Sequence, residues 1–130
     1  MRNLALRNIF VIALCALLPL ARAAQAPDKA IDPVSVSPGL YKVLLENQQV
    51  RVVQYLLEPG QRDEWHTHPP KVSYVVEGGT LRITLKDGKS FVAEEKAGAA
   101  SWMETLGLHF AENIGKTPVK IVLVEVKSAK

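Results

Sequence analysis

The chain has 130 residues, with sixteen Lys and Arg against thirteen Asp and Glu, and its single cysteine excludes an internal disulfide. This length suits one domain rather than two. Three of the basic residues, Arg2, Arg7 and Arg22, lie within the first 23 positions, so the remainder carries thirteen charges of each sign. A balanced chain lacks the concentrated basic surface that nucleic-acid binding requires, and we expect no nucleic-acid partner.

Residues 1–23 have the layout of a secretory signal peptide. A basic start leads into an apolar run, Ile9 to Leu20, that is too short to span a bilayer permanently. Ala21-Arg22-Ala23 then precedes a predicted cleavage site before Ala24. We therefore expect a periplasmic or secreted protein that has no membrane association once the signal is removed.

The remainder of the chain divides into an arm and a domain. Residues 24–40 contain Pro27, Pro33 and Pro38 but few large apolar side chains, which indicates an N-terminal arm. Residues 41–127 consist of short β-branched runs separated by turn residues. The predicted strands are 41–45, 50–57, 73–76, 80–85, 90–94, 100–103, 108–113 and 119–126. Turns at this spacing, without helical periodicity, predict a single all-β domain that we interpret as a small β-barrel.

Local sequence patterns also predict how some of these strands are connected and where they lie in a sheet. Asp87-Gly88 lies between two extended runs and is a strong hairpin signal. Residues 119–126 are apolar on both faces, which is typical of a central strand. We expect the large aromatic side chains to lie in the core; these are Trp65, Tyr74, Phe91, Trp102 and Phe110.

The chain has three histidines, and two of them, His66 and His68, are two residues apart. In an extended segment, Glu64, His66 and His68 would share one face, because side chains of a strand alternate. A His-x-His pair alone is also compatible with an exposed loop. His109 supplies a third imidazole, and three imidazoles aimed at one point form a transition-metal site.

These residues resemble the two sequence motifs of the cupin superfamily. The first motif is matched by Gly60, His66, His68 and the Gly78-Gly79 pair, and the second by Gly98, His109 and Asn113. The resemblance covers about residues 41–127. It implies a single cupin-type jelly-roll β-barrel, preceded here by the signal peptide and the arm.

The chain departs from the family pattern at two places. Where the family has a metal-binding Glu, this chain has Lys71 or Val72. Neither can bind a metal, because a charged Lys has no lone pair and Val has no ligand atom. In the second motif, Glu104 replaces the proline and the glycine is displaced to Gly107. The resemblance therefore implies a site of three histidines without the usual carboxylate.

Several residues near this site have open assignments. Glu64 has the strand parity to act as a fourth ligand or to orient an imidazole, but it also suits a solvated carboxylate at the barrel rim. Glu104 is the weaker candidate for the same function. Lys71 would lie at the mouth, either facing an anionic substrate or simply solvated. Asn113 is expected to fix a turn rather than to contact substrate.

Imidazole ligands suit Fe(II), Mn(II), Ni(II), Cu(II) or Zn(II), so we expect one divalent transition metal of unassigned identity. Three protein ligands leave open positions for a small-molecule ligand. The resemblance implies oxygenase-like or lyase-like chemistry on a small organic molecule. The alternative is a non-catalytic small-molecule-binding or sensor protein, because a fold alone does not determine a reaction. By the same resemblance, we expect a homodimer.

Overall fold

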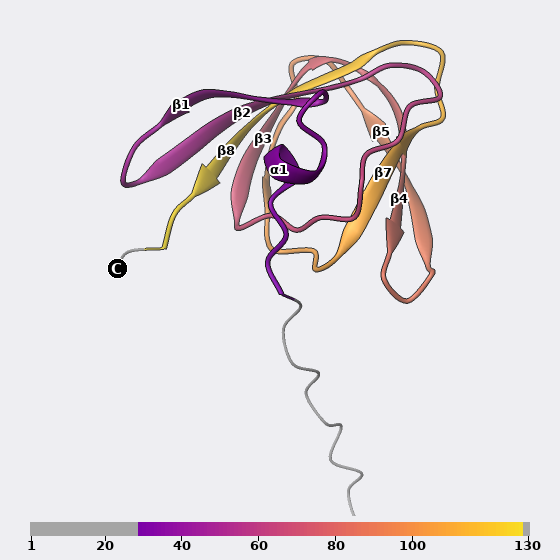
Figure 1. Cartoon of the computed structure of the whole chain (residues 1–130). Coiled ribbons are helices and arrows are strands. Elements are labelled where there is room, and N and C mark those ends of the chain that lie inside the picture. Colours follow the sequence, from indigo (N-terminus) through magenta and orange to yellow (C-terminus); the bar gives the residue numbers. More distant parts are fainter. Residues whose placement is uncertain (1–28, 129–130) are drawn as a thin grey trace, which may run out of the picture.

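The computed structural model describes residues 29–128, which form two groups of strands with one short helix beside them (Figure 1). The predicted signal peptide and the first residues of the predicted arm lie outside the described residues. Within residues 29–128, no helix is both long enough and apolar enough to cross a membrane.

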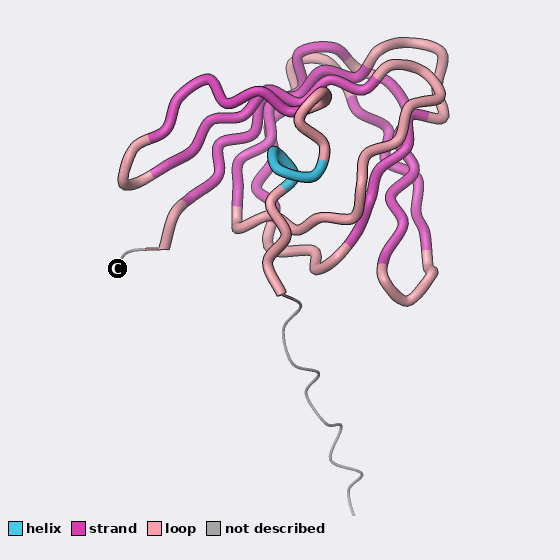
Figure 2. The backbone as a smooth tube through the Cα atoms, in the orientation of Figure 1, coloured by secondary structure: helices cyan, strands magenta, loops and turns pink. Residues whose placement is uncertain are grey.

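The strands form two sheets (Figure 2), and paired strands in both sheets are antiparallel. The larger sheet has the order β1-β2-β8-β3-β6, and its strands are Tyr41–Glu46, Val50–Leu57, Val119–Val126, Lys71–Glu77 and Ala100–Met103. The smaller sheet has the order β5-β4-β7, with strands Ser90–Glu95, Gly79–Leu85 and His109–Asn113. The all-β class, the hairpin at Asp87-Gly88 and the central position of β8 are thus confirmed.

The two sheets do not close into one barrel, which corrects the β-barrel predicted from the turn spacing. The chain passes from β3 in one sheet to β4 in the other across Gly78. Among the described residues, isolated bridges at Arg62–Glu112 and His66–His109 extend the smaller sheet toward the histidine-bearing segment. Turn spacing reports strand number and length. Closure depends on pairing between strands that are far apart in sequence.

The apolar core lies between the sheets and is built mainly on the larger one. Val53, Leu57 and Val119 have no exposed surface, and Ile121 continues the inward face of β8. Leu81 of β4 joins this cluster from the smaller sheet. Full burial of such a side chain stabilises the fold by about 1.5–3 kcal/mol.

Three aromatic side chains expected in the core are about half exposed. Tyr74 of β3, Phe91 of β5 and Trp102 of β6 are 46%, 45% and 54% exposed. Trp65 and Phe110 are half-buried and pack edge to face, with ring centroids 4.7 Å apart. Tyr74 and Trp102 belong to the outer face of the larger sheet, which is apolar although it faces away from the core.

The described part of the arm packs against the domain. Helix α1 spans Pro33–Val36, and the Asp32 carboxylate caps it by accepting a backbone N–H from its first turn. Asp32 also pairs with Arg51 of β2 at 2.8 Å. The backbone N–H of Ile31 donates to the Thr67 hydroxyl, and the N–H of Thr67 donates to the Ile31 carbonyl. These contacts attach the arm directly to the segment between the first two histidines.

Asn113 fixes a turn, as expected. Its Nδ2 donates to the carbonyls of Leu57 and Thr117, both at 2.8 Å, and its Oδ1 accepts the N–H of Gly115 at 2.9 Å. The side chain is almost completely buried. Asn113 therefore connects the end of β2 to the loop that leads into β8.

We predict that Gly78→Ala destabilises the fold by about 1–3 kcal/mol, because a Cβ there collides with the backbone of Glu95 and Ala97, which cannot turn aside as a side chain can. Gly39→Ala is the matched control, since a Cβ at Gly39 meets no atom within 4 Å. That change should stay within about 0.5 kcal/mol. Urea unfolding measures both, and equal midpoints for the two variants would contradict the assignment.

Candidate metal centre

The three histidines come together at a backbone bridge between two distant segments. His66 lies between β2 and β3, and His109 is the first residue of β7. The N–H of His66 donates to the His109 carbonyl at 2.9 Å, and the reverse bond is 3.0 Å long. The segment around His66 is not the regular strand that the His-x-His parity argument assumed. Nevertheless His66 and His68 are both buried, while Thr67 between them faces the arm.

The Nδ1 atom of each imidazole is held by an acceptor. Nδ1 of His66 donates to the Glu64 carbonyl at 2.7 Å, and Nδ1 of His109 donates to the Gly107 carbonyl at 2.8 Å. Nδ1 of His68 donates to the Glu125 carboxylate, also at 2.8 Å. Because carbonyls and carboxylates only accept, all three rings carry a proton on Nδ1, which leaves Nε2 as the atom that a metal would bind.

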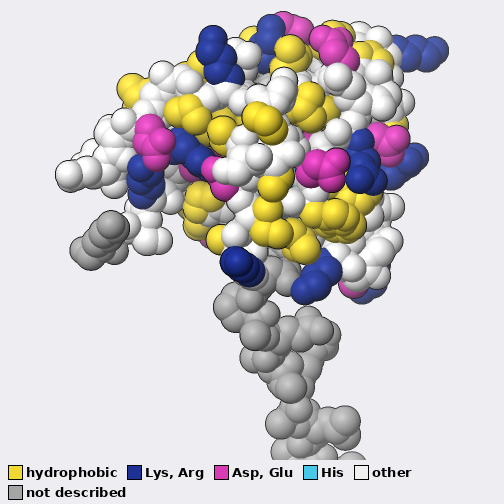
Figure 3. Space-filling model, in the orientation of Figure 1, with side chains coloured by type: hydrophobic (Ala, Val, Ile, Leu, Met, Phe, Trp, Pro, Cys, Tyr) yellow, Lys and Arg dark blue, Asp and Glu magenta, His cyan; other side chains and the backbone are white. Residues whose placement is uncertain are grey.

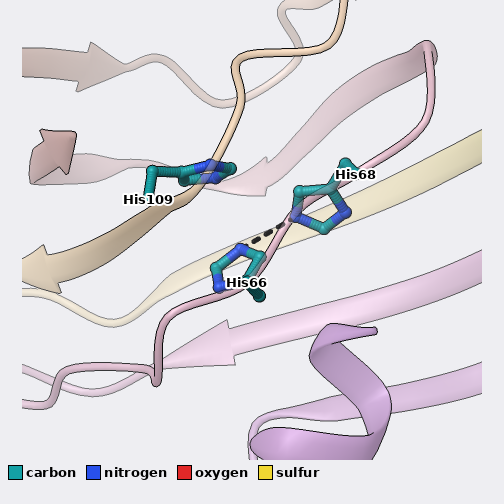
Figure 4. A group of neighbouring side chains, drawn as sticks. All are labelled: His66, His68 and His109. Atoms are coloured by element: carbon teal, nitrogen blue, oxygen red, sulfur yellow. Dashed lines mark hydrogen bonds between the residues drawn. The ribbon is translucent and has the colours of Figure 1, made fainter. Parts of the chain in front are cut away.

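The three imidazoles lie close together, with His66 and His68 facing each other (Figure 4). One ligand atom from each of the three residues can be chosen so that all lie within 4.8 Å of one another. The Nε2 atoms of His66 and His68 are 3.1 Å apart. Ligand bonds of about 2.0–2.1 Å to a shared ion bring imidazole nitrogens about this close. Two ring nitrogens that face each other at 3.1 Å need a proton or a metal ion between them, so the donor set fits a metal.

Burial keeps the imidazoles of His68 and His109 neutral. Burial lowers the pKa of His68 to about 3, although the hydrogen bond to Glu125 acts to raise it. Burial likewise lowers the pKa of His109 to about 4. A metal therefore does not compete with protons for these nitrogens near neutral pH. The histidines are also hidden from outside, and no histidine side chain is visible on the face shown in Figure 3.

Glu125 is part of the site, although sequence reasoning did not select it. It lies on β8 with 1% exposure, and its second oxygen accepts Nε of Arg51 at 2.7 Å. Burial alone would raise its pKa, but the hydrogen bonds from His68 and Arg51 outweigh burial and hold the pKa below its ordinary value. The carboxylate is therefore ionised and orients His68. The only sequence signal was a charged residue at an inward position of an apolar strand.

Asp63 is a buried carboxylate that accepts three hydrogen bonds next to the histidines. Its Oδ2 accepts the hydroxyls of Tyr41 and Tyr55, at 2.8 and 3.1 Å, and its Oδ1 accepts the N–H of Ala111 at 2.6 Å. The Tyr41 oxygen lies 3.3 Å from Nε2 of His66. Burial and the Asp63 charge raise the pKa of both tyrosines, so both hydroxyls stay protonated.

The structure also places the residues that the sequence left open. The side chain of Glu64 is exposed and does not belong to the group of possible ligands; its backbone carbonyl is what holds His66. Glu104 is exposed and accepts Nε1 of Trp102 at 2.6 Å. Lys71 is 4% exposed, which corrects the expectation of a solvated lysine at the mouth, and Val72 faces outward.

A cavity of about 100 Å³ lies between the sheets beside the histidines. Its walls include the three histidines, Tyr55, Lys71, Ile83, Phe91 and Met103. A larger groove of about 830 Å³ lies next to the arm and includes Asp32 and Arg51. His68 and Leu106 line both spaces and therefore mark the boundary between them.

No protein-family model and no curated protein matches the sequence. Among solved structures, a cupin domain from Bordetella pertussis matches with a TM-score of 0.62 and 22% identity, over 81% of this chain and 100% of that one. An RmlC-like cupin with a double-stranded β-helix fold, from Methanocaldococcus jannaschii, has a TM-score of 0.53 and 16% identity, over 66% and 77% of the two chains.

A polyketide cyclase from Streptomyces resistomycificus also matches, with a TM-score of 0.51 and 16% identity, over 66% of this chain and 63% of that one. Likeness at such identities concerns the fold and not the reaction. These matches, with the two-sheet topology, show that the chain has the cupin fold that its histidine motifs predicted.

Proposed function

We propose that the protein is a periplasmic or secreted metal-dependent enzyme that carries out oxygenase-like or lyase-like chemistry on a small organic molecule. The observation that carries the proposal is the clustering of three imidazoles beside a cavity, each held by an acceptor at Nδ1 and with ligand atoms that lie within 4.8 Å of one another. A divalent ion held there would supply Lewis acidity at its open positions.

The surrounding side chains would position the substrate and exclude water. Ile83 and Phe91 are apolar side chains that line the same cavity as the histidines, and Asp63 fixes both tyrosine hydroxyls. The polyketide cyclase with this fold supports the view that such a scaffold accommodates chemistry on organic molecules. The cavity is smaller than the 300–1,000 Å³ of ordinary ligand pockets, which favours a small substrate.

A non-catalytic small-molecule-binding or sensor protein is the second candidate. This candidate is favoured because the two carboxylates closest to the histidines already accept hydrogen bonds from other groups of the protein. Asp63 already accepts from two tyrosines and a backbone N–H, and Glu125 accepts from His68 and Arg51. Neither is free to act as a general base, so turnover measurements have to separate the two candidates.

We predict that the purified protein retains one divalent ion per chain after equilibration with Fe(II), Mn(II), Ni(II), Cu(II) or Zn(II) and desalting. His109→Ala should retain only a small fraction of it, because two imidazoles hold such an ion far more weakly than three. Elemental analysis measures occupancy, and circular dichroism confirms that the variant is folded. Glu104→Gln is the control, since its exposed side chain contacts Trp102 and not the histidines.

Metal-loaded protein also tests the assignment of Glu64 and the presence of enzymatic activity. Glu64→Gln should leave the metal affinity unchanged, because the backbone carbonyl rather than the carboxylate contacts His66. Oxygen consumption or product formation with a panel of phenolics and small organic acids, lost in His109→Ala, would establish the enzyme. Retention of no metal by the wild-type protein would refute the proposal, and ligand binding without any turnover would favour the sensor.

A pH dependence follows from the buried histidines. The unfolded chain takes up protons on His68 and His109 below pH about 6.5, whereas the native metal-free protein does not until about pH 4 or below. Its free energy of unfolding should therefore fall as the pH drops from 6.5, approaching about 1.4 kcal/mol per pH unit for each histidine. Urea unfolding between pH 7 and 5 measures this slope. A His68→Gln/His109→Gln double variant should show a clearly shallower slope, and an equal slope would contradict the assignment.

We also propose that the protein forms a homodimer through the outer face of its larger sheet. Val72, Tyr74 and Val76 of β3 lie on this face with Trp102 of β6 and Val126 of β8, and all five are exposed. A contiguous exposed apolar patch marks an interaction site, and sheets pack readily face to face. A second copy of the same flat face, related by a two-fold axis, would cover it.

If the protein is a dimer, its molar mass measured by light scattering should be twice the mass of one chain. Tyr74→Lys should shift the protein to monomer, because it places a charge in the middle of the buried face. Val92→Lys is the control, since Val92 is 55% exposed but belongs to β5 of the smaller sheet. A wild-type monomer at high concentration, or dissociation by both substitutions alike, would reject this interface.

A further inference from the structure

Lys71 places a cationic side chain between the sheets, next to the histidine cluster. It is the first residue of β3, and its Cα is paired with Glu125 of β8 on one side and Met103 of β6 on the other. Residues directly opposite in neighbouring strands project to the same face. Lys71 therefore points inward with Glu125, is 4% exposed, and lines the cavity beside the histidines.

The Lys71 ammonium has no partner among residues 29–128. No acceptor there hydrogen-bonds to it within 3.5 Å, and no carboxylate lies within 4.0 Å. Glu125, the acid opposite it, already accepts from His68 and Arg51. Burial lowers the pKa of Lys71 to about 8, with the Glu125 charge acting against that shift, so the amine stays mostly protonated at neutral pH. Among the described residues no fully buried side-chain nitrogen lacks a hydrogen-bond partner, so the unpartnered ammonium itself reaches the open space of the cavity, where a ligand can supply a counter-charge.

A metal on the histidines would make the cavity more positive still. Imidazoles are neutral ligands, so three of them offset none of the charge of a divalent ion. Asp63 is engaged by two tyrosine hydroxyls and a backbone N–H. Glu95, the other acid on the cavity wall, is half-buried, and burial raises its pKa. The donors to Asp63 are neutral and leave its negative charge in place. A divalent ion together with Lys71 would exceed that single charge, so the histidine end of the metal-loaded cavity would be cationic.

We propose that Lys71 is a substrate-binding residue whose ammonium pairs with the carboxylate of a short organic acid, and that small carboxylates are the substrate class of this site. The inference rests on the proposed function, since it assigns the class of molecule that the site takes. A cavity of about 100 Å³ holds only a few non-hydrogen atoms. Its apolar wall, with Ile83 and Phe91, suits the hydrocarbon end of such an acid.

The test compares propionate with its neutral isostere propionamide by isothermal titration calorimetry, on Zn(II)-loaded and on metal-free protein. Wild-type protein should bind propionate at least tenfold more tightly than propionamide. Lys71→Met keeps the length of the side chain and removes its charge, so it should lose at least tenfold in propionate affinity and leave propionamide affinity unchanged. Lys89→Met is the matched control, because Lys89 lies in the β4–β5 turn region with its side chain 81% exposed, and it should bind like wild type.

Metal content, measured on every sample, separates this inference from the proposed function. Lys71→Met should retain metal at least as well as wild type, because a neighbouring cation has been removed. If wild-type protein binds no metal but metal-free protein binds propionate through Lys71, the proposed function fails and the assignment of Lys71 stands. Equal propionate affinity in wild type and Lys71→Met, or no carboxylate binding by wild type, overturns the assignment. Lys71→Gln provides the same comparison if the Met variant does not fold.

Discussion

The site depends on the fixing of each imidazole at the nitrogen that faces away from the cluster. For His66 and His109 the acceptor is the carbonyl two residues earlier in the chain, at Glu64 and Gly107. The two segments run antiparallel and are joined at His66 and His109 themselves. The same local arrangement thus occurs twice. In both cases a backbone carbonyl, and not a side chain, accepts the Nδ1 proton and orients the ring. This is why the protein can keep Nε2 of both rings as the atom that a metal would bind before a metal is present.

His68 is held differently, and the difference links the site to the arm. Its acceptor is the Glu125 carboxylate, which also accepts Arg51, and Arg51 in turn pairs with the Asp32 carboxylate. Asp32 caps helix α1. The chain of charge-assisted bonds therefore runs from a candidate metal ligand to the first turn of a surface helix. Docking of the arm and orientation of His68 are parts of one network, and in such a network each bond supports its neighbours.

The sequence predicted the strands and the histidine cluster well because both depend on short-range patterns. Turn residues delimit the strands, and spaced motifs locate the histidines. Closure of the sheets and the inclusion of Glu125 were not predictable in this way, since both depend on pairing between distant strands. The choice between the two assignments of Glu64 stayed open for a related reason. The parity argument assumed a regular strand, whereas the segment around His66 is an irregular loop with isolated bridges.

In strand β3 the hydrophobic alternation of the sequence does not match the direction in which the side chains point. Its inward residues are Lys71, Ser73 and Val75, whereas its outward residues are Val72, Tyr74 and Val76. Hydrophobic alternation alone assigns the wrong face to the interior, because the inward face is the more polar of the two. Deviations from local rules gather at functional sites, where polar groups are retained for chemistry rather than stability. The apolar side chains of β2 and β8 supply the core that compensates for them. The polar inward face of β3 is therefore itself an argument that the space it borders binds a ligand.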